Sequence, residues 1–288
     1  MKPFSRIISG TMTWGAWGNL FSSSQMQSII EEAVDMEIYT FDNADIYGDY
    51  TTEFEFGKAF SQSNVNREKV QFITKCGIQL PSQANPLRVK HYDYSGDHIR
   101  MSVENSLRNL HTDYIDLLLI HRPSPLMEVE VISKEFQKLQ KEGKVKYFGV
   151  SNFNSYQMQL LQKEISVTWN QIQCSLTHET PMFDGTLDYM KVHEIGVMAW
   201  NPLGLYFKED SPQKKRIKKI LVPLCEKYDC SDDQLLLAWL LQHPSKIHPV
   251  IGTKSIARLK KSIMATKINL DLTDWFLMLE ASIGKPLP

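Results

Sequence analysis

Residues 114–123 read YIDLLLIHRP, and residues 129–143 read VEVISKEFQKLQKEG. The first stretch is a short run of apolar residues that favour β-structure, which predicts a buried strand. The second stretch places its apolar residues at the spacing of an amphipathic helix. A strand followed by such a helix is the unit from which parallel sheets are built. This part of the chain therefore predicts one strand–helix unit of an α/β fold.

The same unit recurs along the whole chain. The expected strands lie at 6–12, 39–43, 70–77, 114–123, 145–153, 167–175, 197–204 and 248–255, and a helical segment follows each of them. Eight such units favour a closed barrel over an open doubly wound sheet, which usually has about six strands. We therefore expect an α/β fold, namely a single (β/α)8 TIM barrel over residues 1–288 with extra helices near the C-terminus. An open sheet is the alternative.

Two segments lie outside this alternation. Residues 78–97 form a polar stretch that we expect to be a loop. Residues 212–229 read PQKKRIKKILVPLCEKYD and predict an additional helix before the main helix of the seventh unit. We interpret the lysines of this helix as a solvated face.

The composition is typical of a soluble globular protein. Hydrophobic residues make up 42% and charged residues 23% of the 288 residues, and the net charge is −1. This balance gives no electrostatic basis for binding nucleic acid or an anionic membrane. The four cysteines lack the spacing of a zinc site or a disulfide framework, and no apolar run approaches the ~20 residues of a transmembrane helix. We expect a cytoplasmic monomer or small homo-oligomer whose partner is a small molecule, not a nucleic acid, a membrane or a metal.

Polar residues follow the expected strands at the end where a barrel carries its chemistry. They are Asp42, Tyr47, Lys75, His121, Ser151, Asn152, Gln171, Trp200 and Asn201. Taken singly, each has an ordinary structural explanation; His121, for example, could be a satisfied core histidine. As a set they favour acid–base chemistry over a metal site, because His121 has no second histidine at ligand spacing and a lysine repels a cation.

The phenol of Tyr47 and the amine of Lys75 together suggest a proton donor. A free tyrosine has a pKa of about 10. A cation about 4 Å away, at an effective dielectric constant of about 20, favours the phenolate by about 4 kcal/mol. We therefore expect Lys75 to lower the pKa of Tyr47, and Asp42 to orient Lys75 while it offsets part of that effect. The stretch YTFDNADIYG (39–48) would then end a strand in an acid that protonates an oxygen atom.

The chain resembles the aldo-keto reductases, which are NADPH-dependent carbonyl reductases built on a (β/α)8 barrel. The resemblance covers nearly the whole chain and rests on motifs in the family's order: GTMTWG (10–15), FDNADIYG (41–48), EFEFGKAF (53–60), ITKCG (73–77), YIDLLLIHRP (114–123), GKVKYFGVSNF (143–153), WNQIQCS (169–175), AWNPLG (199–204) and VIGTKSIARL (250–259). It implies that Tyr47 is the general acid and that Lys75 and Asp42 tune it. It also implies that His121 orients the substrate carbonyl or relays the proton.

The resemblance further implies that NADPH or NADP+ is the cofactor. Ser151, Asn152 and Gln171 would hold the nicotinamide carboxamide, and Trp200 would stack on the ring. The other expected cofactor contacts are Gly10, Thr11, Met12, Asn201, Leu203, Gly204, Thr253, Lys254, Ser255 and Arg258. The last four of these would bind the adenosine 2′-phosphate, because cations at a helix N-terminus suit a phosphate dianion. No GxGxxG motif follows the first strand, which disfavours a Rossmann enzyme.

Small aldehydes or ketones are the expected substrates. The chain begins close to its first strand and ends soon after the segment LTDWFLMLEASIG, so we expect an open substrate pocket. Its walls would be Trp14, Trp17, Tyr50 and the segments 78–97 and 205–211.

Two other functions are kept as alternatives. The first is a regulatory barrel, like the cofactor-binding subunits of potassium channels in this family, with negligible turnover; the lack of an extended N-terminal segment weighs against it. The second is an isomerase or aldolase in which Lys75 forms a Schiff base.

Overall fold

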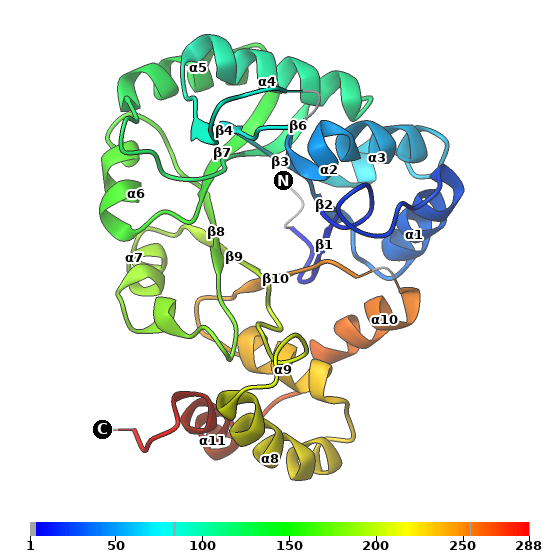
Figure 1. Ribbon diagram of the computed structural model, residues 1–288, viewed down its shortest axis with the longest axis vertical. Coiled ribbons are helices and arrows are strands. Elements are labelled where there is room, and N and C mark those ends of the chain that lie inside the picture. Colours follow the sequence, from blue (N-terminus) through cyan, green and yellow to red (C-terminus); the bar gives the residue numbers. More distant parts are fainter. Residues whose placement is uncertain (1–3, 83–84, 254, 288) are drawn as a thin grey trace.

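The protein is a closed barrel of eight parallel strands with helices on its outside (Figure 1). The computed structural model describes residues 4–82, 85–253 and 255–287. The barrel strands are β1 (Ile8–Gly10), β2 (Thr40–Asp42), β3 (Gln71–Cys76), β6 (Ile115–Ile120), β7 (Val145–Ser151), β8 (Trp169–Gln173), β9 (Gly196–Trp200) and β10 (His248–Ile251). Their order around the barrel is β1-β10-β9-β8-β7-β6-β3-β2. The expected (β/α)8 barrel is thus confirmed, and the open-sheet alternative is wrong.

Helices follow the barrel strands along the chain. They are α1 (Ser23–Asp35), α3 (Thr52–Ser61), α4 (Gly96–Asn109), α5 (Val129–Lys141), α6 (Ser155–Gln162), α7 (Thr186–Val192), α9 (Asp232–Leu241) and α10 (Ile256–Ala265). The start of α1 has a local cause, because Ser22 and Gln25 form a capping box that satisfies two free backbone N–H groups. The buried side chains of α5 include Ile132, Phe136 and Leu139, which is the helical spacing that the sequence shows.

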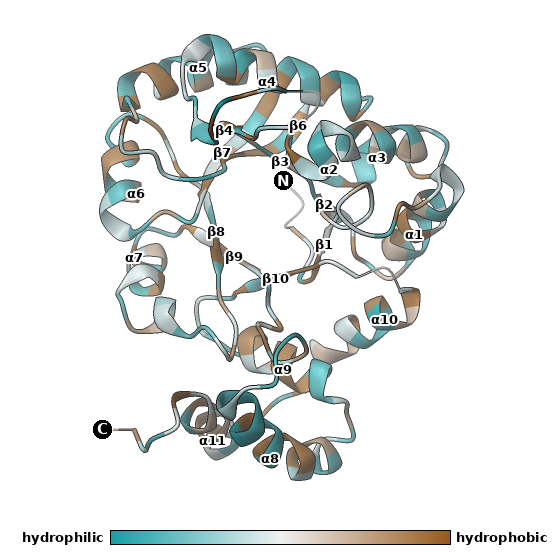
Figure 2. Ribbon diagram, in the orientation of Figure 1, coloured by the Kyte–Doolittle hydropathy of each residue, from teal (hydrophilic) through white to brown (hydrophobic). Residues whose placement is uncertain are grey.

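The segments outside the alternation have structures of their own. Residues 78–97 contain an antiparallel pair, β4 (Ile78–Gln79) and β5 (His91–Tyr92), so the expectation of a plain loop is wrong there. The Lys-rich segment is helical, as expected: α8 (Pro212–Lys227) packs against α11 (Leu272–Ile283), and its lysines at 215, 218 and 219 are exposed. The mostly hydrophobic α9 lies between this helix pair and the barrel (Figure 2).

A cluster of apolar side chains lies inside the barrel. The buried members of this cluster are Phe4, Ile8, Ile73, Leu117, Leu119, Met198 and Val250. Phe4 packs edge-on against Trp169, with ring centroids 5.0 Å apart. Polar side chains lie at both ends of this interior: Thr40 Oγ1 donates to Gln71 Oε1 at 2.7 Å at the starts of β2 and β3, and Asp42 and Lys75 are paired at their C-terminal ends.

His248, at the start of β10, predicts how stability depends on pH. Its ring packs edge-on against Trp169, and its Nδ1 lies 3.0 Å from the carbonyl oxygen of Ser5. Burial lowers the pKa of His248 to about 4. An unfolded histidine titrates near about 6.5, so the unfolded chain binds the extra proton between these two pH values. The contribution of His248 to the free energy of unfolding is therefore fully present above about pH 6.5. It is lost as the pH falls toward 4, and the loss from this group is at most about 3 kcal/mol.

We expect urea unfolding to show a lower free energy of unfolding at about pH 4 than at about pH 7. The variant His248→Asn keeps a side-chain donor near Ser5 but cannot titrate, so it should lose part of this dependence. An identical pH dependence in the variant and the wild type would contradict the assignment to His248.

Candidate active site

Four side chains that the sequence predicts as catalytic meet at the C-terminal end of the barrel. Asp42 is the last residue of β2, Lys75 lies near the end of β3, and His121 directly follows β6. Ile73 belongs to the interior cluster, and side chains alternate along a strand, so Lys75 also points into the barrel. Tyr47 comes from the short helical turn α2 (Tyr47–Tyr50) after β2.

The amine of Lys75 is the centre of this group. Its Nζ donates hydrogen bonds to Asp42 Oδ1 at 2.8 Å, to Tyr47 Oη at 2.9 Å and to the carbonyl oxygen of Asn43 at 2.8 Å. These bonds use all three protons of an ammonium group. Burial acts to lower the pKa of Lys75, but Asp42 and Tyr47 raise it by more, so it lies above its ordinary value. Lys75 is therefore a buried cation at neutral pH.

Tyr47 is held as a protonated phenol. Burial raises its pKa, Lys75 lowers it, and Asp42 raises it again, so the pKa of Tyr47 lies above its ordinary value. The expectation that Lys75 would give a net lowering is therefore wrong. Only 8% of Tyr47 is exposed, so desolvation of the phenolate outweighs the attraction of a lysine whose field Asp42 already offsets. A phenol that stays protonated at neutral pH can act as an acid.

A left-handed turn directly follows Tyr47. Gly48 has φ of 60°, and the next two residues, Asp49 and Tyr50, have φ of 55° and 70°. A Cβ on Gly48 would lie 2.4 Å from Thr52 Oγ1, so only glycine fits there. The glycine in the stretch YTFDNADIYG thus lets the chain turn directly after Tyr47 and continue into α3.

His121 lies beside Tyr47 as a neutral imidazole. The two ring centroids are 6.2 Å apart, with a T-shaped arrangement. Burial and the positive charge of Lys75 hold the pKa of His121 well below its ordinary value. Its Nδ1 is buried and has no hydrogen-bond partner among the described residues. A neutral imidazole offers one donor and one acceptor nitrogen, so His121 can hold an oxygen atom near Tyr47.

The residues expected to hold the nicotinamide join the same hydrogen-bond network. Gln171 Nε2 donates to Asp42 Oδ1 at 2.9 Å, and Ser151 Oγ donates to the Gln171 carbonyl oxygen at 2.9 Å. Asn152 Nδ2 donates to Ser151 Oγ, and its Oδ1 accepts from Trp200 Nε1, both at 2.8 Å. The network therefore runs from Asp42 to the indole of Trp200, and it fixes the orientation of that ring.

The other expected cofactor residues lie around the same mouth of the barrel. Gly10 ends β1 and pairs with Asp42, and Thr11 Oγ1 donates to the Asp42 carbonyl oxygen at 3.1 Å. Met12 is exposed. Asn201 and Gly204 both have positive φ in the loop after β9, which also carries Leu203.

The expected phosphate-binding residues lie at the start of α10. Ser255 is the N-cap residue, and its side chain makes no capping hydrogen bond. The Ser255 N–H donates to Thr253 Oγ1 at 3.1 Å, and Arg258 is exposed in the first turn. Lys254 lies outside the described residues.

The three expected substrate-pocket residues differ in their positions. Trp17 is 37% exposed, and its ring centroid is 6.1 Å from that of Tyr47. The hydroxyl of Tyr50 accepts from the Leu80 N–H at 2.8 Å, which ties α2 to the segment 78–97. Trp14 is fully buried in a hydrophobic cluster with Phe56, so its assignment to the pocket wall is wrong. An indole in a strand-end loop can point to either side, and this one completes the core.

Two further residues at this mouth were not predicted from the sequence. Asn43 accepts from Lys75 through its carbonyl oxygen, and its Oδ1 accepts from Thr11 Oγ1 at 2.7 Å. The guanidinium of Arg122 lies 5.7 Å from the ring centroid of Trp200. Both directly follow a predicted catalytic residue, and that adjacency is the signal that could have found them.

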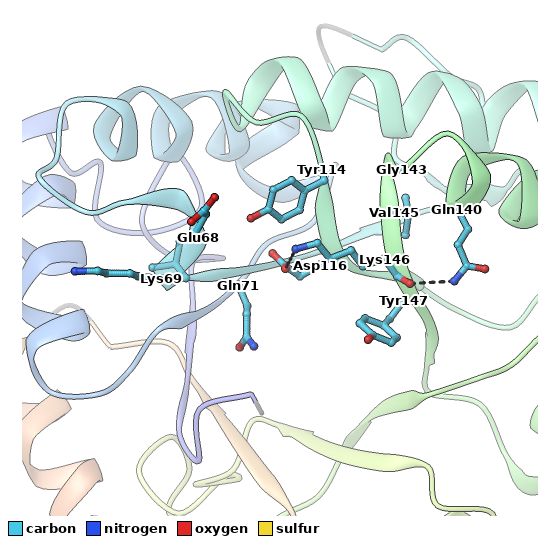
Figure 3. A pocket seen from close by; sticks show the side chains of 11 residues that line it. Glu68, Lys69, Gln71, Tyr114, Asp116, Gln140, Gly143, Val145, Lys146 and Tyr147 are labelled. Atoms are coloured by element: carbon cyan, nitrogen blue, oxygen red, sulfur yellow. Dashed lines mark hydrogen bonds and ion pairs between the residues drawn. The ribbon is translucent and has the colours of Figure 1, made fainter. Parts of the chain in front are cut away.

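A cavity of about 560 Å³ lies at the opposite end of the barrel from the candidate site (Figure 3). It is formed at the N-terminal ends of β3, β6 and β7. Asp116 in its wall is paired with Arg67 at 2.8 Å and with Lys146 at 3.2 Å. Because these charges satisfy one another, we place the candidate chemistry at the C-terminal end. Among the described residues, no three His, Cys, Asp or Glu side chains are grouped as metal ligands.

The chain belongs to the aldo/keto reductase family, whose model matches residues 6–282. It is 41% identical over 291 residues to an uncharacterised oxidoreductase of Bacillus subtilis, covering 99% of this chain and 96% of the relative. It is 37% identical over 287 residues to a 6-dehydroglucose reductase of Agrobacterium fabrum, covering 98% and 95%.

A solved aldo/keto reductase structure from Klebsiella pneumoniae, in complex with NADP and acetate, has the same fold. The TM-score is 0.78 at 24% identity, over 98% of this chain and 92% of that one. Within the described ranges, none of the helices is long and apolar enough to cross a membrane.

Proposed function

We propose that this protein reduces aldehydes or ketones to alcohols with NADPH, and that Tyr47 is the proton donor. The observation that carries the proposal is the set of three hydrogen bonds from Lys75 Nζ, which join a buried cation to a protonated phenol and a carboxylate. This arrangement supplies a proton and stabilises the phenolate left behind. Membership of the family and the NADP complex of the Klebsiella pneumoniae protein support the choice of cofactor.

Each residue has a separate task in the proposed reaction. NADPH, when bound, supplies the hydride. The side chains of Ser151, Asn152 and Gln171 hold the nicotinamide amide, and the indole of Trp200 supports one face of the ring. The substrate carbonyl oxygen lies between the hydroxyl of Tyr47 and the imidazole of His121.

The proton moves from Tyr47 Oη to that oxygen as negative charge develops on it. Lys75 stabilises the resulting phenolate, and Asp42 holds Lys75 in place. The positions of these groups before reaction reduce the reorganisation that the transition state would otherwise require.

Lys75 is poorly suited to the alternative Schiff-base chemistry. A Schiff base needs a neutral amine that a carbonyl carbon can reach. Lys75 is 1% exposed, its pKa is raised mainly because of Asp42 against the effect of burial, and all three of its protons are bonded. These features favour its role as a fixed cation beside Tyr47.

The start of α10 suits the 2′-phosphate that distinguishes NADPH from NADH. The Ser255 side chain leaves the first N–H groups of the helix uncapped, and these groups with the helix dipole attract an anion. The planar guanidinium of Arg258, in the same turn, adds several N–H donors that suit a phosphate.

Arg258→Ala should weaken NADPH binding by about 10- to 100-fold and leave NADH binding nearly unchanged, because only NADPH carries the phosphate. Both dissociation constants are measured by quenching of protein fluorescence. Lys260→Ala is the control, since Lys260 is exposed on the same helix. Equal losses for the two cofactors would remove Arg258 from the phosphate site.

The substrate panel should include a sugar aldehyde. One relative is named as a 6-dehydroglucose reductase, and it covers nearly the whole chain. NADPH oxidation by the purified protein is measured with sugar aldehydes, simple aldehydes, ketones and quinones. Turnover on any of these would support a carbonyl reductase and begin to define its substrates. Tight NADPH binding without turnover on any of them would favour the regulatory alternative.

A further inference from the structure

Arg122 lies at the mouth of the barrel beside the indole of Trp200. It follows His121 at the end of β6, yet its guanidinium lies 5.7 Å from the ring centroid of Trp200 at the end of β9. Strands β7 and β8 separate β6 from β9 in the barrel order. The indole of Trp200 extends toward β7, because its Nε1 donates to Asn152 Oδ1 at 2.8 Å, so the two side chains meet at the mouth of the barrel. The charged group of Arg122 therefore lies where the proposed substrate enters.

The backbone of Arg122 is fixed at the rim. The hydroxyl of Tyr94 donates to the Arg122 carbonyl oxygen at 2.5 Å and accepts from the Arg122 N–H at 3.2 Å. Tyr94 is itself buried. Two bonds to one buried hydroxyl therefore fix the backbone from which the Arg122 side chain extends.

The guanidinium is a cation without an acidic partner. Arg122 is half-buried, and its side chain makes no hydrogen bond or ion pair with any of the described residues. A partly desolvated charge without a partner is unfavourable, and a bound anion would relieve this cost. The positive charges of Arg122 and of Lys90, which is exposed in the segment 78–97, both lower the pKa of His121.

The described acids near the mouth are not paired with Arg122. Asp42 is paired with Lys75. Burial and the charge of Glu53 hold the pKa of Asp45 well above its ordinary value, so Asp45 is not a counter-charge. Asp49 accepts from the indole of Trp17 at 3.1 Å and is exposed. Among the described residues, none of these three acids forms an ion pair with Arg122.

We propose that Arg122 binds an anionic group on the carbonyl substrate, either a carboxylate or a phosphate. The proposal rests on the function proposed above and narrows its substrate class to carbonyl compounds that carry such a group. The planar fork of the guanidinium matches either oxyanion, whereas a neutral ester or alcohol offers it only weaker acceptors.

The test compares matched substrates in the wild type and in Arg122→Met. The carboxylate pair is 4-carboxybenzaldehyde and its methyl ester, and the phosphate pair is glyceraldehyde 3-phosphate and glyceraldehyde. In at least one pair, Arg122→Met should lower kcat/KM for the anion by about 10- to 100-fold and for the neutral partner by less than about threefold. The pair with the larger effect identifies the anion. Arg122→Lys should restore part of the loss, and the exposed Arg108→Met is the control.

Cofactor and substrate roles are separated by measuring NADPH binding. The dissociation constant for NADPH should be the same in Arg122→Met and the wild type. A comparable loss of NADPH affinity would overturn the proposal, because Arg122 would then serve the cofactor. Equal losses for anionic and neutral substrates, or no loss for either, would also overturn it.

Binding alone tests the proposal if the wild type shows no turnover. In that event the dissociation constants of 4-carboxybenzaldehyde and glyceraldehyde 3-phosphate are measured on the complex with NADP+. Weaker binding of either compound to Arg122→Met than to the wild type would support the anion site, although carbonyl reduction had failed. Unchanged binding of both compounds would overturn the anion site as well.

Discussion

Tyr47→Phe is expected to lower kcat for carbonyl reduction by about 10²- to 10⁴-fold while NADPH affinity stays nearly unchanged. Phenylalanine keeps the ring that packs near Trp17 and His121 but removes the hydroxyl group that Lys75 holds in position. The hydroxyl acts on the substrate oxygen and not on the cofactor. The loss should therefore appear in the chemical step, measured by single-turnover oxidation of NADPH.

A matched control for this variant is Tyr50→Phe. Tyr50 lies on the same turn, but its hydroxyl bonds to the backbone of Leu80 and not to Lys75. We expect it to retain most of the activity. Turnover by Tyr47→Phe equal to that of the wild type would remove Tyr47 from its role as the acid.

Lys75→Met should abolish detectable reduction near neutral pH and should also destabilise the fold. The phenolate that forms at Tyr47 would lose its adjacent cation, and Asp42 would be left as a buried charge without its partner. Removing one member of a buried ion pair typically costs about 3 to 5 kcal/mol. Activity and the free energy of unfolding, by urea titration, are both measured.

The double variant Lys75→Met/Asp42→Asn separates the two effects. Asparagine removes the unpaired charge, so stability should return toward that of the wild type. Activity should not return, because the cation beside Tyr47 is still absent. A stable single variant with full activity would refute the role given to Lys75, and so would a double variant that regains turnover.

The barrel could be predicted because its periodicity is strong and repeated. Each buried strand reads as a short apolar run, and the following helix shows a separate spacing. The hairpin in residues 78–97 could not be predicted in this way, since β4 and β5 have only two residues each. Strands this short carry no measurable alternation.

The candidate site could be predicted in part, because strand ends in a barrel converge on one mouth. The side-chain directions in the loops could not: Trp14 completes the core whereas Trp17 lies beside Tyr47. The pKa of Tyr47 was predicted in the wrong direction because the effect of burial is not visible in a pairwise charge estimate. The place of Arg122 in the chain, directly after His121, was visible in the sequence, but its contact with Trp200 joins two strand ends that lie far apart along the chain.

The most direct test of the account is whether hydride passes from NADPH to a carbonyl carbon on this protein. The purified wild type is incubated with an aldehyde and NADPH deuterated on the transferring face of C4, and the alcohol is analysed by mass spectrometry. The account predicts deuterium on the former carbonyl carbon and a product yield that Tyr47→Phe loses. Tight binding of NADPH with no labelled alcohol from any carbonyl compound would contradict it.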